Sequence, residues 1–363
     1  MQQGRSQRLM SMKILPVVCC ILLVLICGGC HVDAARRHSD RRRGYKLLVF
    51  GDSFADTGNR APATSEKTSA SRMWYYPYGS SDSAHGNRAT GRLSDGLVQS
   101  DFLARIVGLD ECPSPYRVWD RNAEFSGVNF AVAGAGALDG SPDVPSLSQQ
   151  ISQLRRLVDA GDIDDSDLDD SVALIAIDGL KDYASVDETT SANQIGALSQ
   201  DVTDEIVDGV RRLQRLGVSK VLVNTVPPIG CQPWRSLSTG YNSCDNKGDM
   251  ISIMHNTALT QKLRSSSRGG VLVLDLYAIF NNLLAGDSNS GFRHNNRPLL
   301  APCCDTADPS GFCGQEDSWG RRLYSVCPAP DHTFYWDYVH PTQAAWRAVM
   351  NQLQGPIQDF LGI

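Results

Sequence analysis

The residue types needed for nucleophilic catalysis stand near the two ends of the sequence. Ser53 follows the apolar run Leu47–Phe50 in the stretch KLLVFGDSFADTGN. A serine hydroxyl is a weak nucleophile until a neighbouring base takes its proton. Asp337 and His340 form a D-x-x-H pair in FYWDYVHPTQAAW, and such a turn can bring the carboxylate onto the imidazole. These residues predict a serine nucleophile, a histidine base and an acid that orients the base.

The G-D-S triplet and the D-x-x-H pair each arise often by chance. Their places in the chain are therefore stronger evidence for a catalytic role than the motifs themselves. Ser53 closes the first expected strand, and His340 directly precedes Pro341, which we expect to open the last helix. A helix N-terminus beside His340 disfavours the charged ring, which suits a base that is neutral at rest. A lone histidine before a helix is otherwise more often a cap or a surface residue.

Short apolar runs alternate with amphipathic helical patterns along the chain. The expected strands are Leu47–Phe50, Val128–Val132, Val172–Ile177, Lys220–Asn224 and Val271–Leu274. Their Val, Ile and Leu content is typical of strands covered on both faces. One helix is expected to begin after the Ser146–Gln149 capping box, and a second is expected to end at Gly217. A third is expected over residues 247–264. The alternation predicts one α/β domain with a five-stranded parallel sheet, whose ligand crevice lies outside the carboxyl ends of the strands.

The first 45 residues are not expected to belong to that domain. Arg5, Arg8 and Lys13 precede the apolar run ILPVVCCILLVLI, and small residues follow it. This pattern predicts a secretory signal peptide over residues 1–35. The run is shorter than the ~20 residues of a spanning helix, so no stable membrane anchor is expected. Residues 36–45 are then a basic, mobile N-terminal arm, and 46–363 form the single domain.

Composition and cysteine usage narrow the function classes. The 363 residues are 42% hydrophobic with a net charge of -6, so no overall basic field points to nucleic acid. Seven cysteines follow the expected signal, at positions 112, 231, 244, 303, 304, 313 and 327. In an oxidising compartment most would pair, and an odd number leaves at least one free or paired outside the chain.

The cysteine spacing favours disulfides over a zinc site, because the last cluster lacks a C-x-x-C pair. Cys231 is expected to pair with Cys244, and Cys304 with Cys313 or with another cysteine of the last cluster. No motif implies a metal or an organic cofactor, and the sequence does not indicate the oligomeric state.

At this point the chain resembles the plant-type GDSL esterase/lipase family of the SGNH hydrolase superfamily. The stretches VFGDSFADTGN, GVNFAVAGAGAL, NTVPPIGCQP and FYWDYVHPTQAAW resemble its sequence blocks. The resemblance implies a three-layer α/β/α flavodoxin-like SGNH-hydrolase fold with a five-stranded parallel sheet. It also implies that Ser53 is the nucleophile, His340 the general base and Asp337 its partner. The backbone N–H groups of Ser53 and Gly134 would then donate to the oxyanion.

The chain departs from this family where a G-x-N-D block is expected after the third strand. It has IAIDGLKDYAS there, which places Lys181 at the position of an asparagine whose side chain completes the oxyanion hole. Lys181 could substitute as a donor, could turn to solvent and leave two backbone donors, or could mark a degenerate site. Losing one oxyanion donor typically costs ~10²–10³ in turnover.

The resemblance implies a secreted serine esterase of the apoplast or cell wall, with an acyl-enzyme on Ser53. Candidate substrates are acyl lipids, cutin-like esters and O-acetyl groups on cell-wall polysaccharide. The alternative is a catalytically weakened relative that binds an ester or glycan ligand, and Lys181 alone suggests it. The aromatic stretch MWYYPY (73–78) could line an acyl or sugar pocket or could anchor its own loop.

Overall fold

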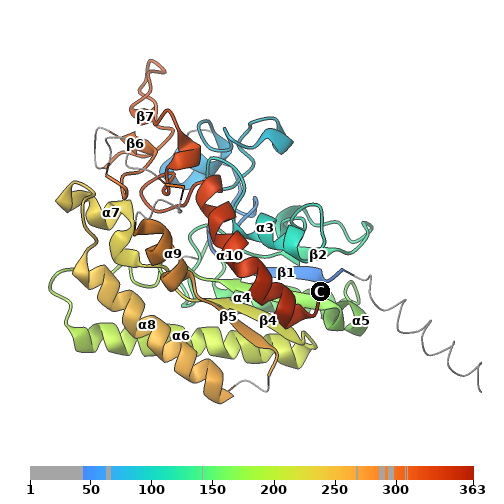
Figure 1. Ribbon diagram of the computed structural model, residues 1–363. Coiled ribbons are helices and arrows are strands. Elements are labelled where there is room, and N and C mark those ends of the chain that lie inside the picture. Colours follow the sequence, from blue (N-terminus) through green and yellow to red (C-terminus); the bar gives the residue numbers. More distant parts are fainter. Residues whose placement is uncertain are drawn as a thin grey trace, which may run out of the picture. The chain divides into compact units, whose positions relative to one another are not determined.

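The computed structural model describes residues 44–62, 67–140, 142–266, 269–285, 291–292, 298–306, 308 and 310–363. The expected signal peptide at 1–35 and all but the last residues of the expected basic arm lie outside this part of the chain. Residues from Tyr45 onward form one compact unit, drawn in Figure 1. Within the part of the chain that the structure describes, no helix has the length and apolar composition needed to cross a membrane.

Five parallel strands form the central sheet in the order β2-β1-β3-β4-β5. Their bounds are β1 Lys46–Gly51, β2 Gly127–Asn129, β3 Ser171–Ala176, β4 Lys220–Asn224 and β5 Val271–Leu274. All five expected strands are present, and the flavodoxin-like order is confirmed. Because β2 and β3 lie on opposite sides of β1, the chain changes direction across the sheet there, and a crevice is expected at that switch point.

The second strand is shorter than expected, ending at Asn129 rather than at Val132. The chain nevertheless continues beside β1, because the Phe130 and Val132 N–H groups donate to the carbonyl oxygens of Val49 and Gly51. Residues 130–132 therefore still approach the carboxyl end of β1.

Helices cover both faces of the sheet. The α-helices are α3 Gln99–Ile106, α4 Leu147–Asp159, α5 Asp165–Asp169, α6 Ala192–Leu216, α7 Pro233–Ser236, α8 Asn246–Ser266, α9 Leu276–Leu284 and α10 Gln343–Leu361. Short 3-10 helices are η2 Ser69–Trp74, η3 Ser83–His85, η4 Tyr116–Val118, η5 Ile229–Cys231, η6 Leu237–Thr239 and η7 Pro330–His332. Helices α4, α6 and α8 pack on one face, and α3, α9 and α10 pack on the other (Figure 1). This is the expected three-layer arrangement.

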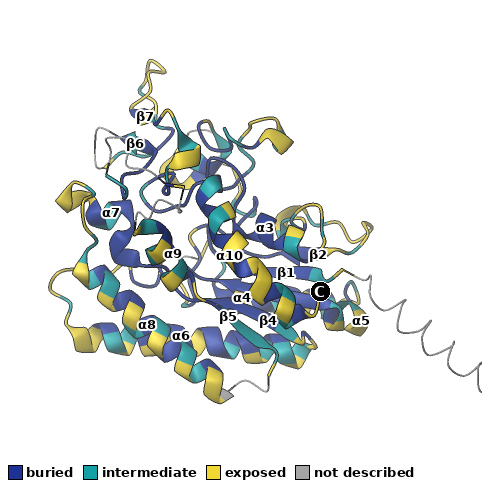
Figure 2. Cartoon of the chain, viewed as in Figure 1, coloured by how far each residue is buried: buried dark blue, intermediate teal, exposed yellow. Residues whose placement is uncertain are grey.

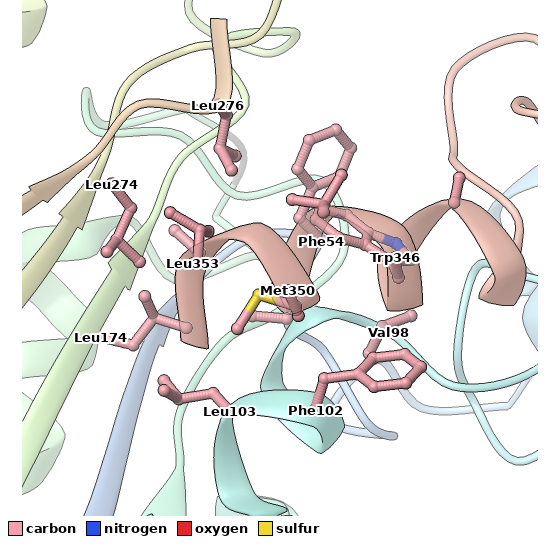
Figure 3. Close-up of a cluster of buried hydrophobic side chains, with 14 of the residues drawn as sticks. Phe54, Val98, Phe102, Leu103, Leu174, Leu274, Leu276, Trp346, Met350 and Leu353 are labelled. Atoms are coloured by element: carbon pink, nitrogen blue, oxygen red, sulfur yellow. The ribbon is translucent and has the colours of Figure 1, made fainter. Parts of the chain in front are cut away.

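The strand residues alternate between the two cores, as the two-residue period of a strand requires. On β1, Leu47 and Val49 join the core under α3, α9 and α10, whereas Leu48 and Phe50 join the core of α4, α6 and α8. Figure 2 shows the buried strands between helices whose outer sides are exposed. In Figure 3, the α10 side chains Trp346, Met350 and Leu353 lie among residues of the sheet and of α3.

Local signals fix several helix ends. The capping box of Ser146 and Gln149 opens α4, and Gly217 ends α6 with a φ of 117°. The expected start of the last helix at Pro341 is wrong by two residues. The Thr342 side chain accepts a hydrogen bond from the Ala345 N–H, so Thr342 is the N-cap and the helix begins at Gln343.

A hairpin cross-linked by disulfides lies between α9 and α10. Strands β6 Cys304–Thr306 and β7 Tyr324–Val326 pair antiparallel. Disulfides join Cys303 to Cys327 and Cys304 to Cys313, and a third joins Cys231 to Cys244 near α7. Both pairings named from the sequence are therefore present, and the cysteines of the last cluster are disulfide-bonded. Among the described cysteines, Cys112 is the one outside a disulfide.

Candidate active site

Ser53 lies directly after β1, at the switch point of the sheet. Gly51 makes this exit possible, because its φ is 142° and a Cβ there would collide with the carbonyl oxygen of Ala176 on β3. The Asp52 carboxylate accepts hydrogen bonds from the N–H groups of Phe54 at 3.0 Å and Asp178 at 2.6 Å. The turn that presents Ser53 is thereby tied to the end of β3.

Ser53, His340 and Asp337 form one hydrogen-bonded line. The Ser53 Oγ atom lies 3.0 Å from His340 Nε2. On the other side of the ring, His340 Nδ1 lies 2.7 and 2.9 Å from the two carboxylate oxygens of Asp337. All three residues are buried. The structure thus brings together the serine, base and acid that the sequence separates by 287 positions.

The D-x-x-H turn is held by its own backbone. Asp337 Oδ1 accepts the N–H groups of Val339 and His340 at 2.9 and 2.8 Å. On the other side, the Phe54 ring packs edge-on against His340 and Trp346, with centroids 6.4 and 5.0 Å away. The imidazole is therefore fixed between a turn and an aromatic side chain.

Asp337 stays ionised in this arrangement. Burial alone would raise the pKa of its carboxyl, but the charge and hydrogen bonds of His340, together with the Arg72 charge, hold that pKa well below its usual range. A carboxylate facing Nδ1 leaves Nε2 as the atom that exchanges a proton with Ser53.

The two backbone N–H groups that were expected to donate to the oxyanion are those of Ser53 and Gly134. Within the described residues, the N–H groups of Ser53 and Gly134 have no hydrogen-bond acceptor. Asp56 joins the loops that carry them, because it accepts the Ala133 N–H at 2.8 Å and the Gly58 N–H at 2.7 Å. Gly134 has a φ of 88° and is exposed, so its N–H is open to a ligand.

Lys181 and Asp182 point to different places. Asp182 accepts the N–H groups of Ala137 and Leu138 at 2.9 and 3.0 Å, which secures the loop that begins at Gly134. Lys181 is exposed, and the end of its chain lies against Gly140 on the same loop. Among the described residues, its ammonium makes no hydrogen bond or ion pair. Lys181 therefore contacts the loop of residues 134–140, and no hydrogen bond among the described residues joins it to Ser53 or His340.

Comparison with known proteins identifies the family. A family model described as GDSL-like Lipase/Acylhydrolase matches residues 47–353. The chain belongs to this family. It is similar to the GDSL esterase/lipase At5g03610 of Arabidopsis thaliana, with 33% identity over 348 residues covering 93% of each chain. The GDSL esterase/lipase At5g03600 of Arabidopsis thaliana is 33% identical over 331 residues, covering 88% of this chain and 96% of the relative.

A relative with a more specific name is the acetylajmalan esterase of Rauvolfia serpentina. It is 30% identical over 334 residues, covering 84% of this chain and 83% of its own. The resemblance inferred from the sequence blocks is therefore confirmed, and this GDSL protein is a carboxylic ester hydrolase.

The sequence reasoning missed one buried acid in the GDSL site, Asp178. Its Oδ1 accepts the Leu180 N–H at 2.7 Å, while Oδ2 is buried with no hydrogen-bond donor among the described residues. Burial and the Asp178 charge raise the pKa of Asp52 well above its usual range, and burial also raises the pKa of Asp178. The Asp178 charge thus disfavours ionisation of Asp52. The only sequence feature that could have indicated a role for Asp178 is its position directly after an apolar strand.

The aromatic stretch 73–78 mostly anchors its loop. Met73 and Tyr78 are buried, and the Trp74 Nε1 donates to the Arg60 carbonyl oxygen at 2.8 Å. Tyr76 is half exposed, with the Arg322 guanidinium 4.7 Å above its ring. These contacts link the loop to the rest of the fold, and they leave Tyr76 as its most exposed aromatic.

A cavity of about 490 Å³ is lined in part by Asn59 and Val132, and none of Ser53, Gly134 and His340 lines it. Tyr116, Phe130 and Pro145 supply further apolar surface, and Arg60 and Arg117 supply charge.

Proposed function

We propose that this GDSL enzyme hydrolyses carboxylic esters through an acyl-enzyme on Ser53. The hydrogen-bonded line from Ser53 Oγ through His340 to Asp337 is the observation that carries the proposal. In the first step, His340 Nε2 takes the hydroxyl proton while Oγ attacks the ester carbonyl carbon. The tetrahedral intermediate collapses when His340 returns that proton to the departing alcohol oxygen.

Deacylation repeats the same proton movements with water. His340 takes a proton from a water molecule, whose oxygen attacks the acyl carbon and forms a second tetrahedral intermediate. Breaking the carbon–Oγ bond releases the carboxylic acid, and the proton on His340 restores the Ser53 hydroxyl. Asp337 holds the imidazole in the tautomer that these steps require and stabilises its charged form.

The oxyanion hole of the proposal has two backbone donors, the N–H groups of Ser53 and Gly134. Their lack of an acceptor within the described residues supports this role. The exposure of Lys181 and its contact with Gly140 favour the hypothesis that Lys181 faces solvent. The alternative, a weakened relative that binds an ester or glycan, predicts very slow turnover because one donor of the family pattern is missing.

The proposed enzyme is secreted and acts in the apoplast or cell wall. The apolar run near the N-terminus and the three disulfides support export, since disulfides persist in oxidising compartments. The substrate is an acyl lipid, a cutin-like ester or an acetylated polysaccharide, and neither a nucleic acid nor a stable membrane anchor takes part. The name of the Rauvolfia serpentina relative favours a short acyl group.

The test combines a fluorophosphonate probe with an ester panel. Secreted wild-type protein and Ser53→Ala are incubated with the probe, and with short-chain esters, long-chain esters and acetylated xylan. Labelling of wild type alone, with hydrolysis that Ser53→Ala abolishes, supports the proposal, and the best ester identifies the acyl class. Hydrolysis by Ser53→Ala within tenfold of wild type rules out Ser53 as the nucleophile. Probe labelling absent from both proteins favours the binding alternative.

A further inference from the structure

The Asp337 carboxylate is held from a second side by a distant loop. Its Oδ2 atom accepts a hydrogen bond from the Tyr78 hydroxyl at 2.8 Å, across 259 positions of sequence. The Arg72 Nε donates to that same hydroxyl at 2.9 Å and lies 3.7 Å from Asp337 Oδ2. A chain of polar contacts thus runs from Arg72 through Tyr78 and Asp337 to His340.

Tyr78 and Arg72 are themselves fixed by the fold. The Tyr78 side chain is fully buried, and its ring packs edge-on against Trp336 with centroids 6.1 Å apart. The Arg72 Nη1 donates to the carbonyl oxygen and the hydroxyl of Ser69 at 2.5 and 3.2 Å. Both partners of the carboxylate therefore have few alternative rotamers, so they can fix its orientation.

The charges around Tyr78 keep its hydroxyl protonated, so it can act as a hydrogen-bond donor to Asp337. Burial and the Asp337 charge raise the pKa of Tyr78 well above its usual range, so the phenol keeps its proton. A neutral phenol that accepts from Arg72 has its hydrogen directed toward Asp337 Oδ2. The N–H groups of Val339 and His340 bind Oδ1 and the Tyr78 hydroxyl binds Oδ2, while His340 Nδ1 lies within hydrogen-bond distance of both oxygens.

We infer that Tyr78 is a positioning residue for the hydrolysis. It fixes the plane of the Asp337 carboxylate so that His340 Nε2 stays aimed at Ser53 Oγ, and Arg72 holds Tyr78 in place. The inference rests on the proposed function, in which Asp337 orients His340. Since Tyr78 has no exposed surface, it does not contact substrate, and its loss lowers kcat rather than raising KM.

The experiment is a double-mutant cycle between Tyr78→Phe and Asp337→Asn, measured as kcat, KM and the rate of fluorophosphonate labelling. Tyr78→Phe alone is expected to lower kcat roughly 10- to 100-fold with KM within about twofold of wild type, as small misplacements of reacting groups do. In the Asp337→Asn background, the same substitution is expected to cost less than about twofold, because it acts through the carboxylate.

Tyr75→Phe is the matched control, because it removes a hydroxyl from the same loop and this hydroxyl makes no hydrogen bond to a described residue. It is expected to keep wild-type kcat. Arg72→Lys provides a second variant that retains the charge but not the planar fork, and it is expected to lower kcat less than Tyr78→Phe does. It tests the inference even where Tyr78→Phe folds poorly.

Three results overturn the inference. Tyr78→Phe and Arg72→Lys could both keep wild-type kcat, Tyr78→Phe could raise KM alone, or its full cost could persist in the Asp337→Asn background. Ser53→Ala, assayed in parallel, separates this failure from that of the proposed function. If Ser53→Ala remains active, the proposed function fails first. If Ser53→Ala is inactive and any of the three results is seen, the inference alone fails.

Discussion

The backbone N–H of Asp178 donates to the Asp52 carboxylate at 2.6 Å, across the switch point between β1 and β3. This contact joins Asp178 to the turn that carries Ser53, and both acidic residues are buried. A pair of this kind shapes the turn, but it destabilises the fold when both acids ionise.

Asp178→Asn is therefore expected to stabilise the protein. The pKa of Asp52 is higher in the folded state than in the unfolded state. At pH values between these two pKa values, the folded state binds more protons than the unfolded state does. The free energy of unfolding therefore falls as the pH rises through this window. Removing one acid lowers this cost, with an expected gain on the order of 1–2 kcal/mol. Thermal unfolding at pH 5 and pH 8 should show the larger rise in Tm at pH 8. The exposed Asp169→Asn is the control, and a lower Tm for Asp178→Asn at pH 8 contradicts the prediction.

His340→Ala and Asp337→Asn should both reduce hydrolysis, in that order of severity. Removing the base is expected to lower kcat roughly 10²–10⁴-fold. Asp337→Asn keeps the shape but loses the charge that stabilises the imidazolium, so its loss is substantial but smaller. Because the pKa of Asp337 is depressed, its carboxylate is ionised throughout the working range, and the deficit should hold from pH 5 to pH 9. Steady-state kinetics over that range check it, and wild-type turnover by Asp337→Asn contradicts it.

Asp56 and Asp182 are unsuited to replace Asp337 as the orienting acid. Their carboxylates accept backbone N–H groups of the loops around Gly134 rather than the His340 ring. Substitution of either should therefore perturb the loop, whereas substitution of Asp337 acts on the base.

Lys181→Ala is expected to leave kcat within about threefold of wild type, because the exposed ammonium lies against Gly140. Lys181→Asn restores the family residue and measures what that amide adds. A loss of ~10²–10³ in Lys181→Ala would instead make Lys181 an oxyanion donor. If Lys181→Asn creates turnover where wild type has none, the natural chain is the weakened relative. The same ester panel and active-site titration decide between these outcomes.

Cys304→Ser should lower both stability and activity. The Cys304 N–H donates to the Trp336 carbonyl oxygen at 2.6 Å, next to Asp337, so the cross-linked hairpin supports the turn that carries the acid and base. Loss of the Cys304–Cys313 disulfide is expected to cost about 2–3 kcal/mol of unfolding free energy. Cys112→Ser is the control, because burial raises the pKa of that free thiol to about 12 and leaves it unreactive. Denaturant unfolding and kcat measure the two effects, and a Cys304→Ser protein equal to the control contradicts the prediction.

Much of the fold followed from local sequence signals. The five strands are apolar runs between helical patterns, and capping residues such as Ser146 and Gly217 marked helix ends. The start of α10 was misplaced because proline suits a first helical turn, whereas the Thr342 hydroxyl supplies the actual cap.

The partners of the candidate site were harder to predict than its central residues. Ser53, Asp337 and His340 lie in recognisable motifs. Asp178 and Tyr78 act through contacts between segments far apart in sequence, and nothing in their local patterns distinguishes them from a turn acid and a loop aromatic. Such partners are defined only when β1, β3, the 69–79 loop and the turn before α10 come together.

Ser53, the proposed nucleophile, and His340, the proposed base, lie near opposite ends of the described domain. A growing chain therefore carries Ser53 long before it carries Asp337 and His340, and synthesis must pass residue 340 before any hydrolytic site can assemble. Fragments that stop short of α10 would hold a serine with no base to activate it. In the proposed mechanism, the order of the elements alone would keep such fragments inactive toward esters.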